Sequence, residues 1–350
     1  MRVTARLSLA ALLTSGLLLS GCAGTTPAPE ETGDARPAQG DSAFTLYSGR
    51  DEALIQPLID QFEQETGIEV EVRYGNTAEL GALLLEEGDA TPADVFLSQD
   101  AGALGALSQD GLFAALPADI AEAVPAGFTS TDATWVGVTG RARVVVYDGE
   151  RFDAADLPDT IDEYVTEEWA GRLGVAPSNA SFQSFVTALR VLEGEDAATT
   201  WVDDLAAGSP QVFENNRAIL AAADQGVLDA GLINHYYWYA AAAEAGAENM
   251  RAQLKFLTAG DAGSIVNVTG AGILSGAADD ADALEFLRFL VSEAAQTYFV
   301  EQTFEYPLLP GIDAPEGLPS IESLVNPDLD LSDLDDLAAT QQLLTDAGLI

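Results

Sequence analysis

Apolar and polar residues alternate along the chain in two different periods, which predicts strands separated by helices. Residues 68–74 alternate apolar and charged side chains, as a half-buried strand does. Residues 51–66 repeat apolar side chains on one helical face and end at Gly67, which predicts a helix. The same patterns predict strands at 43–47, 93–97, 173–175 and 254–257, and helices at 77–87, 101–108, 161–166, 182–192, 197–205, 216–223, 240–245 and 282–296.

This order of elements predicts an α/β fold. Strands that alternate with helices form a mainly parallel sheet, and ligands of such sheets bind beyond the carboxyl ends of the strands. That rule places Asp51 and the turn at residues 98–100 at one rim. Two continuous apolar runs, 135–138 and 143–147, predict two strands that lie at a sheet centre or cross between lobes.

The first residues predict a secretory signal rather than part of the fold. Arg2 and Arg6 precede an apolar run at 7–19, which is too short to span a bilayer. The sequence Leu-Ser-Gly-Cys that ends at Cys22 resembles the lipobox of bacterial lipoproteins, in which the cysteine is acylated. We therefore predict a signal peptide at 1–21, a lipid on Cys22, and a flexible tether at 22–42 that is rich in Thr, Pro, Gly and Glu. No later segment has the length and apolarity of a membrane span.

Composition narrows the function. Among 350 residues, 57 are acidic and 14 are Lys or Arg, so the formal charge of −43 opposes nucleic acid and anionic membrane as partners. One cysteine cannot form an intramolecular disulfide or a thiolate cluster, and one histidine leaves little for a catalytic triad. The acidic run 328–336 has Asp333 and Ala339 where an EF-hand loop needs Gly and Glu, so we interpret it as a solvated face.

The densest group of chemically useful side chains is residues 233–239. Four aromatic residues and the only histidine, His235, follow a predicted apolar strand there. Two adjacent tyrosine hydroxyls can converge at a helix start or in a loop, and a hard cation would stabilise them. The alternative is that these aromatic rings pack a core or an interface.

Residues 66–70, 86–96 and 233–239 carry a family resemblance. The sequence resembles the ferric-iron-binding proteins of bacterial ABC importers, and the similarity runs from about residue 43 to 350. The resemblance implies a two-lobed periplasmic binding protein type II fold with the ligand in the cleft between the lobes. It implies an N-lobe of residues 43–142 and 268–317, and a C-lobe of residues 143–267 and 318–350.

The resemblance implies that Fe(III) binds to the phenolates of Tyr236 and Tyr237. Fe(III) prefers anionic oxygen ligands, and a free phenol ionises near pH ~10, so binding must expel protons. Relatives often carry His and Glu where this chain has Asp51 and Gln99. Asp51 is predicted either to bind the metal or to cap a helix, Gln99 is a poor ligand for Fe(III), and Asp100 is a possible substitute.

A small anion such as carbonate or phosphate often completes the iron site in this family. Asn179, Ala180 and Ser181 match the anion-binding turn by position, and a helix start favours an anion there. The alternative is that Ser178 or Ser181 only caps the helix. Asn216 and Asn234 are further anion candidates by alignment, while we expect His235 to pack rather than to bind the ligand.

The predicted function is therefore capture of Fe(III) and its delivery to an ABC permease, by a lipoprotein outside the cytoplasm. We expect a monomer that contacts the membrane only through its lipid anchor. The alternative is a binding protein of the same fold for an anionic or organic solute, such as a phosphonate, sulfate or polyamine. An enzyme that uses Asp51 and Asp100 as a carboxylate pair ranks last, because nothing else in the chain supports turnover.

Overall fold

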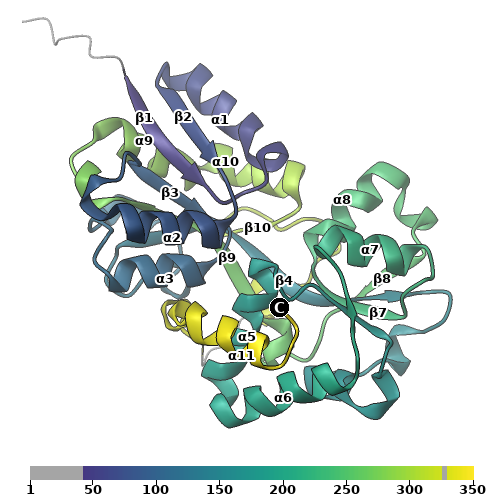
Figure 1. The fold of residues 1–350 in the computed structure, drawn as a ribbon. Coiled ribbons are helices and arrows are strands. Elements are labelled where there is room, and N and C mark those ends of the chain that lie inside the picture. The colour runs from purple at the N-terminus through teal and green to yellow at the C-terminus, as the bar shows by residue number, and fades with distance from the viewer. Residues whose placement is uncertain (1–41, 325–328) are drawn as a thin grey trace, which may run out of the picture. The chain divides into compact units, whose positions relative to one another are not determined.

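A sheet of ten strands with helices around it forms the core of the computed structural model, which describes residues 42–324 and 329–350 (Figure 1). The strands are β1 Ala43–Ser48, β2 Glu69–Tyr74, β3 Val95–Ser98, β4 Trp135–Asp148, β5 Leu173–Val175, β6 Gln211–Val212, β7 Ala230–Asn234, β8 Ala252–Lys255, β9 Val266–Ile273 and β10 Tyr306–Pro307. The α-helices are α1 Glu52–Thr66, α2 Thr77–Glu87, α3 Ala101–Gln109, α4 Ala118–Ala121, α5 Ala180–Glu193, α6 Glu195–Ala207, α7 Asn216–Asp224, α8 Tyr236–Ala245, α9 Ala281–Leu290, α10 Glu293–Tyr298 and α11 Leu337–Asp346.

Helix α1 shows how local sequence sets the ends of an element. The carboxylate of Asp51 accepts a hydrogen bond from the N–H of Ala53 and caps the helix start. Gly67 ends the helix with a φ of 75°, a left-handed conformation that glycine adopts readily. Four apolar side chains bury one face, each contributing about 1.5–3 kcal/mol; they are Ile55, Leu58, Ile59 and Phe62. The helix predicted at 51–66 is confirmed, with Asp51 as its cap.

The strand order is β2-β1-β3-β9-β4-β7-β5-β6, and β8 and β10 also pair with β4. β1 is parallel to β2 and β3, and β5 is parallel to β6 and β7. β9 is antiparallel to β3 and β4, and β7 is antiparallel to β4. The predicted α/β class is confirmed. The sheet is mixed because β9 and β4 lie between two sets of parallel strands. β9 pairs with β3 of one set and β4 pairs with β7 of the other, both antiparallel.

Strand β4 joins the two parallel sets. Its segment Trp135–Ala142 pairs with β9, and its segment Arg143–Tyr147 pairs with β7. We call β1, β2, β3, β9, β10 and the earlier segment of β4 the first half of the sheet, and the later segment with β5 to β8 the second half. The prediction of two separate strands here is wrong, because the residues between them keep their pairing with β9 after an irregularity at Gly137. The change of partner falls at the predicted lobe boundary, and the division into lobes stays a prediction.

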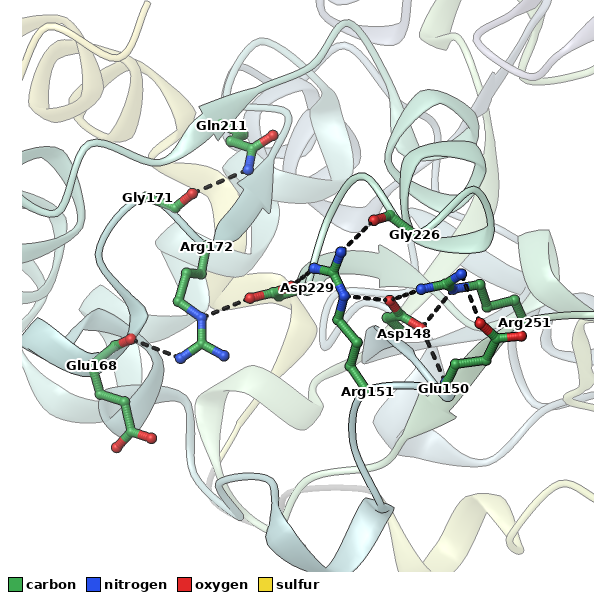
Figure 2. A network of polar contacts seen from close by, with 10 residues as sticks. All are labelled: Asp148, Glu150, Arg151, Glu168, Gly171, Arg172, Gln211, Gly226, Asp229 and Arg251. Carbon is green, nitrogen blue, oxygen red and sulfur yellow. Dashed lines mark hydrogen bonds and ion pairs between the residues drawn. The ribbon is translucent and has the colours of Figure 1, made fainter.

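A network of ion pairs ties together the strand ends of the second half (Figure 2). Asp148, at the end of β4, accepts hydrogen bonds of 2.7 and 2.6 Å from Arg251. Arg151 pairs with Asp148 at 3.1 Å and also with Asp229, which accepts a 2.7 Å bond from Arg172. The network holds the end of β4 to the start of β7 and to β8. Three of the few arginines of this acidic chain therefore have a structural role.

The C-terminal residues pack against helices that are distant in sequence. Helix α11 contacts α5, α3 and α6. The acidic run before it forms a short 3-10 helix at Leu331–Asp335. The expectation of a solvated face holds for Asp333 and Asp336, which are exposed, but is wrong for Leu331 and Leu334, which are buried. Their apolar side chains anchor the run on the core.

The predicted membrane-related residues lie mostly outside the described part of the chain. The predicted signal peptide at 1–21, Cys22 and the predicted tether up to residue 41 are not among the described residues. Within the described ranges, no helix has both the length and the apolarity needed to cross a membrane. The described residues form one compact unit.

Candidate functional site

Two adjacent tyrosines lie at the start of α8, directly after the buried strand β7. Tyr236 is 2% exposed and Tyr237 is partly exposed. Their rings stack, with centroids 4.3 Å apart and planes 29° apart. Burial and the charge of Tyr237 raise the pKa of Tyr236 well above 10, although Arg50 opposes the shift. Tyr236 is therefore a neutral phenol, and only a strong cation would convert it to phenolate.

His235 fixes the backbone next to the tyrosines. Its ring is fully buried, and its Nδ1 accepts a 3.1 Å hydrogen bond from the N–H of Ala142 in β4. Nε2 therefore carries the proton, which it donates to the carbonyl oxygen of Phe304 at 2.9 Å. Burial lowers the pKa of His235 to about 4, so the ring is neutral at pH 7. These contacts agree with the expectation that His235 packs and hydrogen-bonds.

Two buried arginines contribute positive charge from the first half of the sheet. Arg50 Nη2 lies 2.8 Å from Glu305 Oε2, and Arg50 Nη1 donates to the Thr269 hydroxyl at 3.1 Å. Burial acts to lower the pKa of Arg50, but Glu305 and the tyrosines raise it overall. Arg141 donates from Nη2 to the carbonyl of Val268 at 3.0 Å, while its Nε and Nη1 have no partner among the residues that the structure describes. Arg50 is thus neutralised by a carboxylate, and Arg141 keeps donors to spare.

Arg143, the first residue of the β4 segment in the second half, is a buried cation without an ion pair among the described residues. Its Nη1 donates to the Ser181 hydroxyl at 3.1 Å, and its Nε and Nη2 have no hydrogen-bond partner within residues 42–324 and 329–350. Burial lowers the pKa of Arg143 to about 9, with Tyr237 and Tyr236 opposing the shift. Asn234 is its register neighbour on β7. A buried cation with unused donors is costly unless an anion joins it.

The predicted anion-binding residues cluster at the start of α5. Asn179 caps this helix, and its Oδ1 accepts bonds of 3.0 Å from the N–H and 2.6 Å from the hydroxyl of Ser181. Asn216 Nδ2 donates to the Ser181 hydroxyl at 3.2 Å, and Asn216 Oδ1 is buried and has no partner in the described ranges. Ala180 is the first residue of the helix. Ser181 is thus shared by Asn179, Asn216 and the buried arginine of β4, and the cap of α5 is Asn179.

Asp51 is occupied by protein groups. Its Oδ1 caps α1 through Ala53, and its Oδ2 lies 3.1 Å from Arg217 Nη2. Arg217 belongs to α7, and its guanidinium carbon lies 5.9 Å from the centroid of the Tyr237 ring. Arg217 therefore contacts both Asp51 and Tyr237.

The next two candidates follow β3. Gln99 is partly exposed, and its backbone N–H donates to the Thr77 hydroxyl at 3.1 Å. Asp100 is 2% exposed and caps α3 by accepting a 3.1 Å bond from the N–H of Gly102. Its other oxygen has no partner among the described residues. Burial raises the pKa of Asp100, against the charge of Arg141. Asp100 is therefore a structural cap with one unused oxygen.

The arginines and Glu305 are the site residues that the sequence interpretation missed. The available signal was Arg141 and Arg143 inside the otherwise apolar run of β4, since charged residues are rarely fully buried without a partner. The pairing of Arg50 with Glu305 had no local signal, because 255 positions separate them.

The chain is similar to known bacterial binding proteins. A family model described as bacterial extracellular solute-binding protein matches residues 90–328. The Major ferric iron-binding protein of Neisseria meningitidis is 35% identical over 321 residues, which cover 90% of this chain and 95% of that protein. The Fe(3+)-binding periplasmic protein of Serratia marcescens is 30% identical over 317 residues, which cover 90% and 93%.

A solved structure is also similar. The structure of iron-bound HitA from Pseudomonas aeruginosa matches with a TM-score of 0.83 and 31% identity, and covers 88% of this chain and 99% of that one. This likeness confirms the predicted fold class, a two-lobed α/β periplasmic binding protein.

Proposed function

The chain belongs to the family of bacterial extracellular solute-binding proteins, and we propose that its solute is ferric iron, bound by the phenolates of Tyr236 and Tyr237. Members of this family bind and transport solutes rather than catalyse reactions. The names of the relatives support iron as the solute, because they describe ferric-iron-binding proteins.

One observation supports this proposal above the others: the stacked tyrosine pair lies beside Arg143, a buried cation with no carboxylate partner in the described part of the chain. A core built only for packing would leave that charge unneutralised. Burying an unpaired ion costs on the order of several kcal/mol. The two phenolates would offset charge on the iron itself, and an anion bound with it would supply the negative charge that Arg143 lacks. Fe(III) is a cation hard enough to displace both phenolic protons.

Charge counting favours an additional anion in the iron-loaded site. Fe(III) and two phenolates together carry one positive charge, next to the positive charge of Arg143. We propose that carbonate or phosphate binds at Asn179, Ala180 and Ser181, with Asn216 and Asn234 beside it. Three features support this position: the unused Nε and Nη2 of Arg143, the unpartnered Oδ1 of Asn216 and the positive end of α5. The Oδ1 of Asn216 would accept a hydrogen bond from a protonated phosphate or from a water.

We also propose the cellular arrangement from the sequence. The signal peptide ends at residue 21, the lipid is attached to Cys22, and the tether holds a monomeric binding protein outside the cytoplasm, where it delivers iron to an ABC permease. Family membership supports an ABC transporter as the partner. We propose an N-lobe of residues 43–142 and 268–317 and a C-lobe of residues 143–267 and 318–350, with Tyr236 and Tyr237 on the C-lobe.

Replacing both tyrosines by phenylalanine tests the iron site. The native protein with ferric citrate should develop a visible absorption band from phenolate-to-iron charge transfer, and Tyr236→Phe with Tyr237→Phe should abolish it. Removing a group that only hydrogen-bonds to a metal ligand typically lowers metal affinity ~10–100-fold. Removing the ligands themselves should lower the ferric affinity by more than that. Tyr239→Phe is the matched control in the same helix and should keep the band. Native ferric affinity in the double variant would exclude the proposed site.

The alternative solute is an anion or an organic molecule, such as a phosphonate, sulfate or polyamine. The unpaired Arg143 favours an anion even without iron. Calorimetry of the metal-free protein with phosphate, sulfate, a phosphonate and a polyamine, in the presence of a metal chelator, separates the two functions. Tight binding of one of them without iron, together with no uptake of ferric citrate, would support the alternative.

A further inference from the structure

Arg217 connects elements from the two halves of the sheet. It is the second residue of α7, which packs against β7 and β4. Its partner Asp51 caps α1, which packs against β2 in the first half. The ion pair measures 3.1 Å between Arg217 Nη2 and Asp51 Oδ2. The contact therefore joins α7 to α1 at the edge of the tyrosine site.

The carboxylate of Asp51 has no oxygen free of protein contacts. One oxygen accepts the N–H of Ala53 at 3.0 Å, and the other faces the guanidinium of Arg217. An iron ligand at this position would have to give up the ion pair and face the metal instead. Arg217 in turn lies over the ring of Tyr237, with its guanidinium carbon 5.9 Å from the ring centroid. A cation at that distance is attracted to the ring face.

We propose that Asp51 does not bind the metal, and that the Asp51–Arg217 ion pair holds the two halves of the sheet together over the iron site. Arg217 is then a positioning residue, which acts on the cargo through Tyr237 and through the closed arrangement of the halves. This inference rests on the proposed binding of ferric iron. It gives Asp51 a defined role where the family resemblance implied an iron ligand.

The exposure of the pair sets the size of its effect. The Arg217 side chain is 59% exposed and that of Asp51 is 42% exposed. Exposed ion pairs are typically worth about 0.2–1 kcal/mol, which corresponds to a change of up to about 5-fold in a rate or equilibrium. The pair therefore adjusts how fast iron leaves and does not determine whether iron binds.

The test measures the rate at which excess chelator removes Fe(III) from the loaded protein. Asp51→Asn keeps the helix cap, because asparagine caps as well as aspartate does, and Arg217→Gln removes the charge. Each single variant should release iron about 2- to 5-fold faster than the native protein. The double variant should release it no faster than Arg217→Gln alone, because both changes break the same pair. Arg217→Lys, which keeps the charge, should release iron at nearly the native rate.

Arg288→Gln is the matched control, because Arg288 forms an exposed ion pair with Asp119 at 2.6 Å within the first half; it should release iron at the native rate. Slower release in Arg217→Gln would overturn the inference, since it would show Asp51 freed to bind iron. The inference would also be overturned if the increases in release rate of the two single variants multiplied in the double variant. An increase of about a hundredfold or more in Asp51→Asn alone would overturn it as well. Failure of the native protein to take up Fe(III) would instead refute the proposed function.

Discussion

Arg143 places a full positive charge inside the protein, next to two phenols and the start of α5. The residue keeps only one of its side-chain donors satisfied, through Ser181. Replacing a buried charge by an apolar side chain of similar volume often leaves stability unchanged or raises it. The persistence of an unsatisfied cation at this point is therefore best explained by a negatively charged ligand.

Arg143→Met tests this explanation at the level of one residue. We expect the metal-free variant to unfold in urea at the native denaturant concentration or above it. Its ferric affinity in phosphate buffer should fall about 10–100-fold, the equivalent of one lost hydrogen bond to a charged group. Added phosphate should strengthen iron binding by the native protein and not by the variant. Arg172→Met, in the ion-pair network of Figure 2, is the control. An unchanged response to phosphate in Arg143→Met would contradict the assignment.

The residues of the site differ in how far the sequence predicted them. The tyrosine pair was visible as a dense aromatic segment, and Asn179, Ser181 and Asn216, which came from the family resemblance, do lie in one hydrogen-bonded cluster. The role of Arg143 depends on which groups surround it, and that is a property of the packed core rather than of its neighbours in sequence. A pattern read along the chain cannot supply it.

At the scale of elements, local signals predicted what local forces determine. Helix α1 followed from its apolar face, its cap and Gly67, all within one segment. The two predicted strands of β4 are one strand, because Gly140 pairs with both β9 and β10, partners that lie far away in sequence. The helix predicted at 282–296 is two helices, α9 and α10, and α10 continues into a π-helix at Phe299–Thr303. Such interruptions depend on tertiary contacts that the periodicity does not contain.

Arg190 of α5 contacts the start of α11, which gives the attachment of α11 a predictable response to acid. Arg190 Nη2 lies 2.7 Å from Glu195 and 2.9 Å from Asp336, the cap of α11, and lowers the pKa of both carboxyl groups. A carboxyl group with a lowered pKa stabilises the fold above its unfolded pKa, about 4, and loses that contribution as the pH falls through its folded pKa. The attachment of α11 should therefore weaken below about pH 4.

Amide hydrogen exchange checks this expectation. Protection of Leu337–Asp346, corrected for the intrinsic effect of pH on exchange, should decrease below pH ~4 before that of β4 and β9. Arg190→Gln should show the reduced protection of the same helix already at pH 7, with native protection in the sheet. Equal protection of α11 in Arg190→Gln and in the native protein would show that apolar packing, including buried Leu344, holds the helix instead.

At the scale of the whole molecule, the few basic residues are used at particular places. Arg50, Arg141, Arg143 and Arg217 lie around the tyrosines, and Arg151, Arg172 and Arg251 lie in the network of Figure 2. With 57 acidic residues against 14 Lys and Arg, most carboxylates have no basic partner. The surface carboxylates therefore repel one another at neutral pH, while the site carries local positive charge.

This distribution predicts that salt stabilises the protein. Raising KCl from 0.1 to 1 M shortens the screening distance from about 10 to 3 Å, which weakens repulsion between separated carboxylates far more than it weakens ion pairs in contact. The thermal midpoint of the metal-free protein at pH 7 should rise, by roughly 1.5 °C for each kcal/mol of repulsion removed. NaCl should give the same shift if screening is the cause. The dependence should shrink near pH ~4, where carboxylates begin to take up protons. A midpoint that falls as KCl increases would mean that the ion pairs, including the Asp148 network, outweigh the net charge of −43.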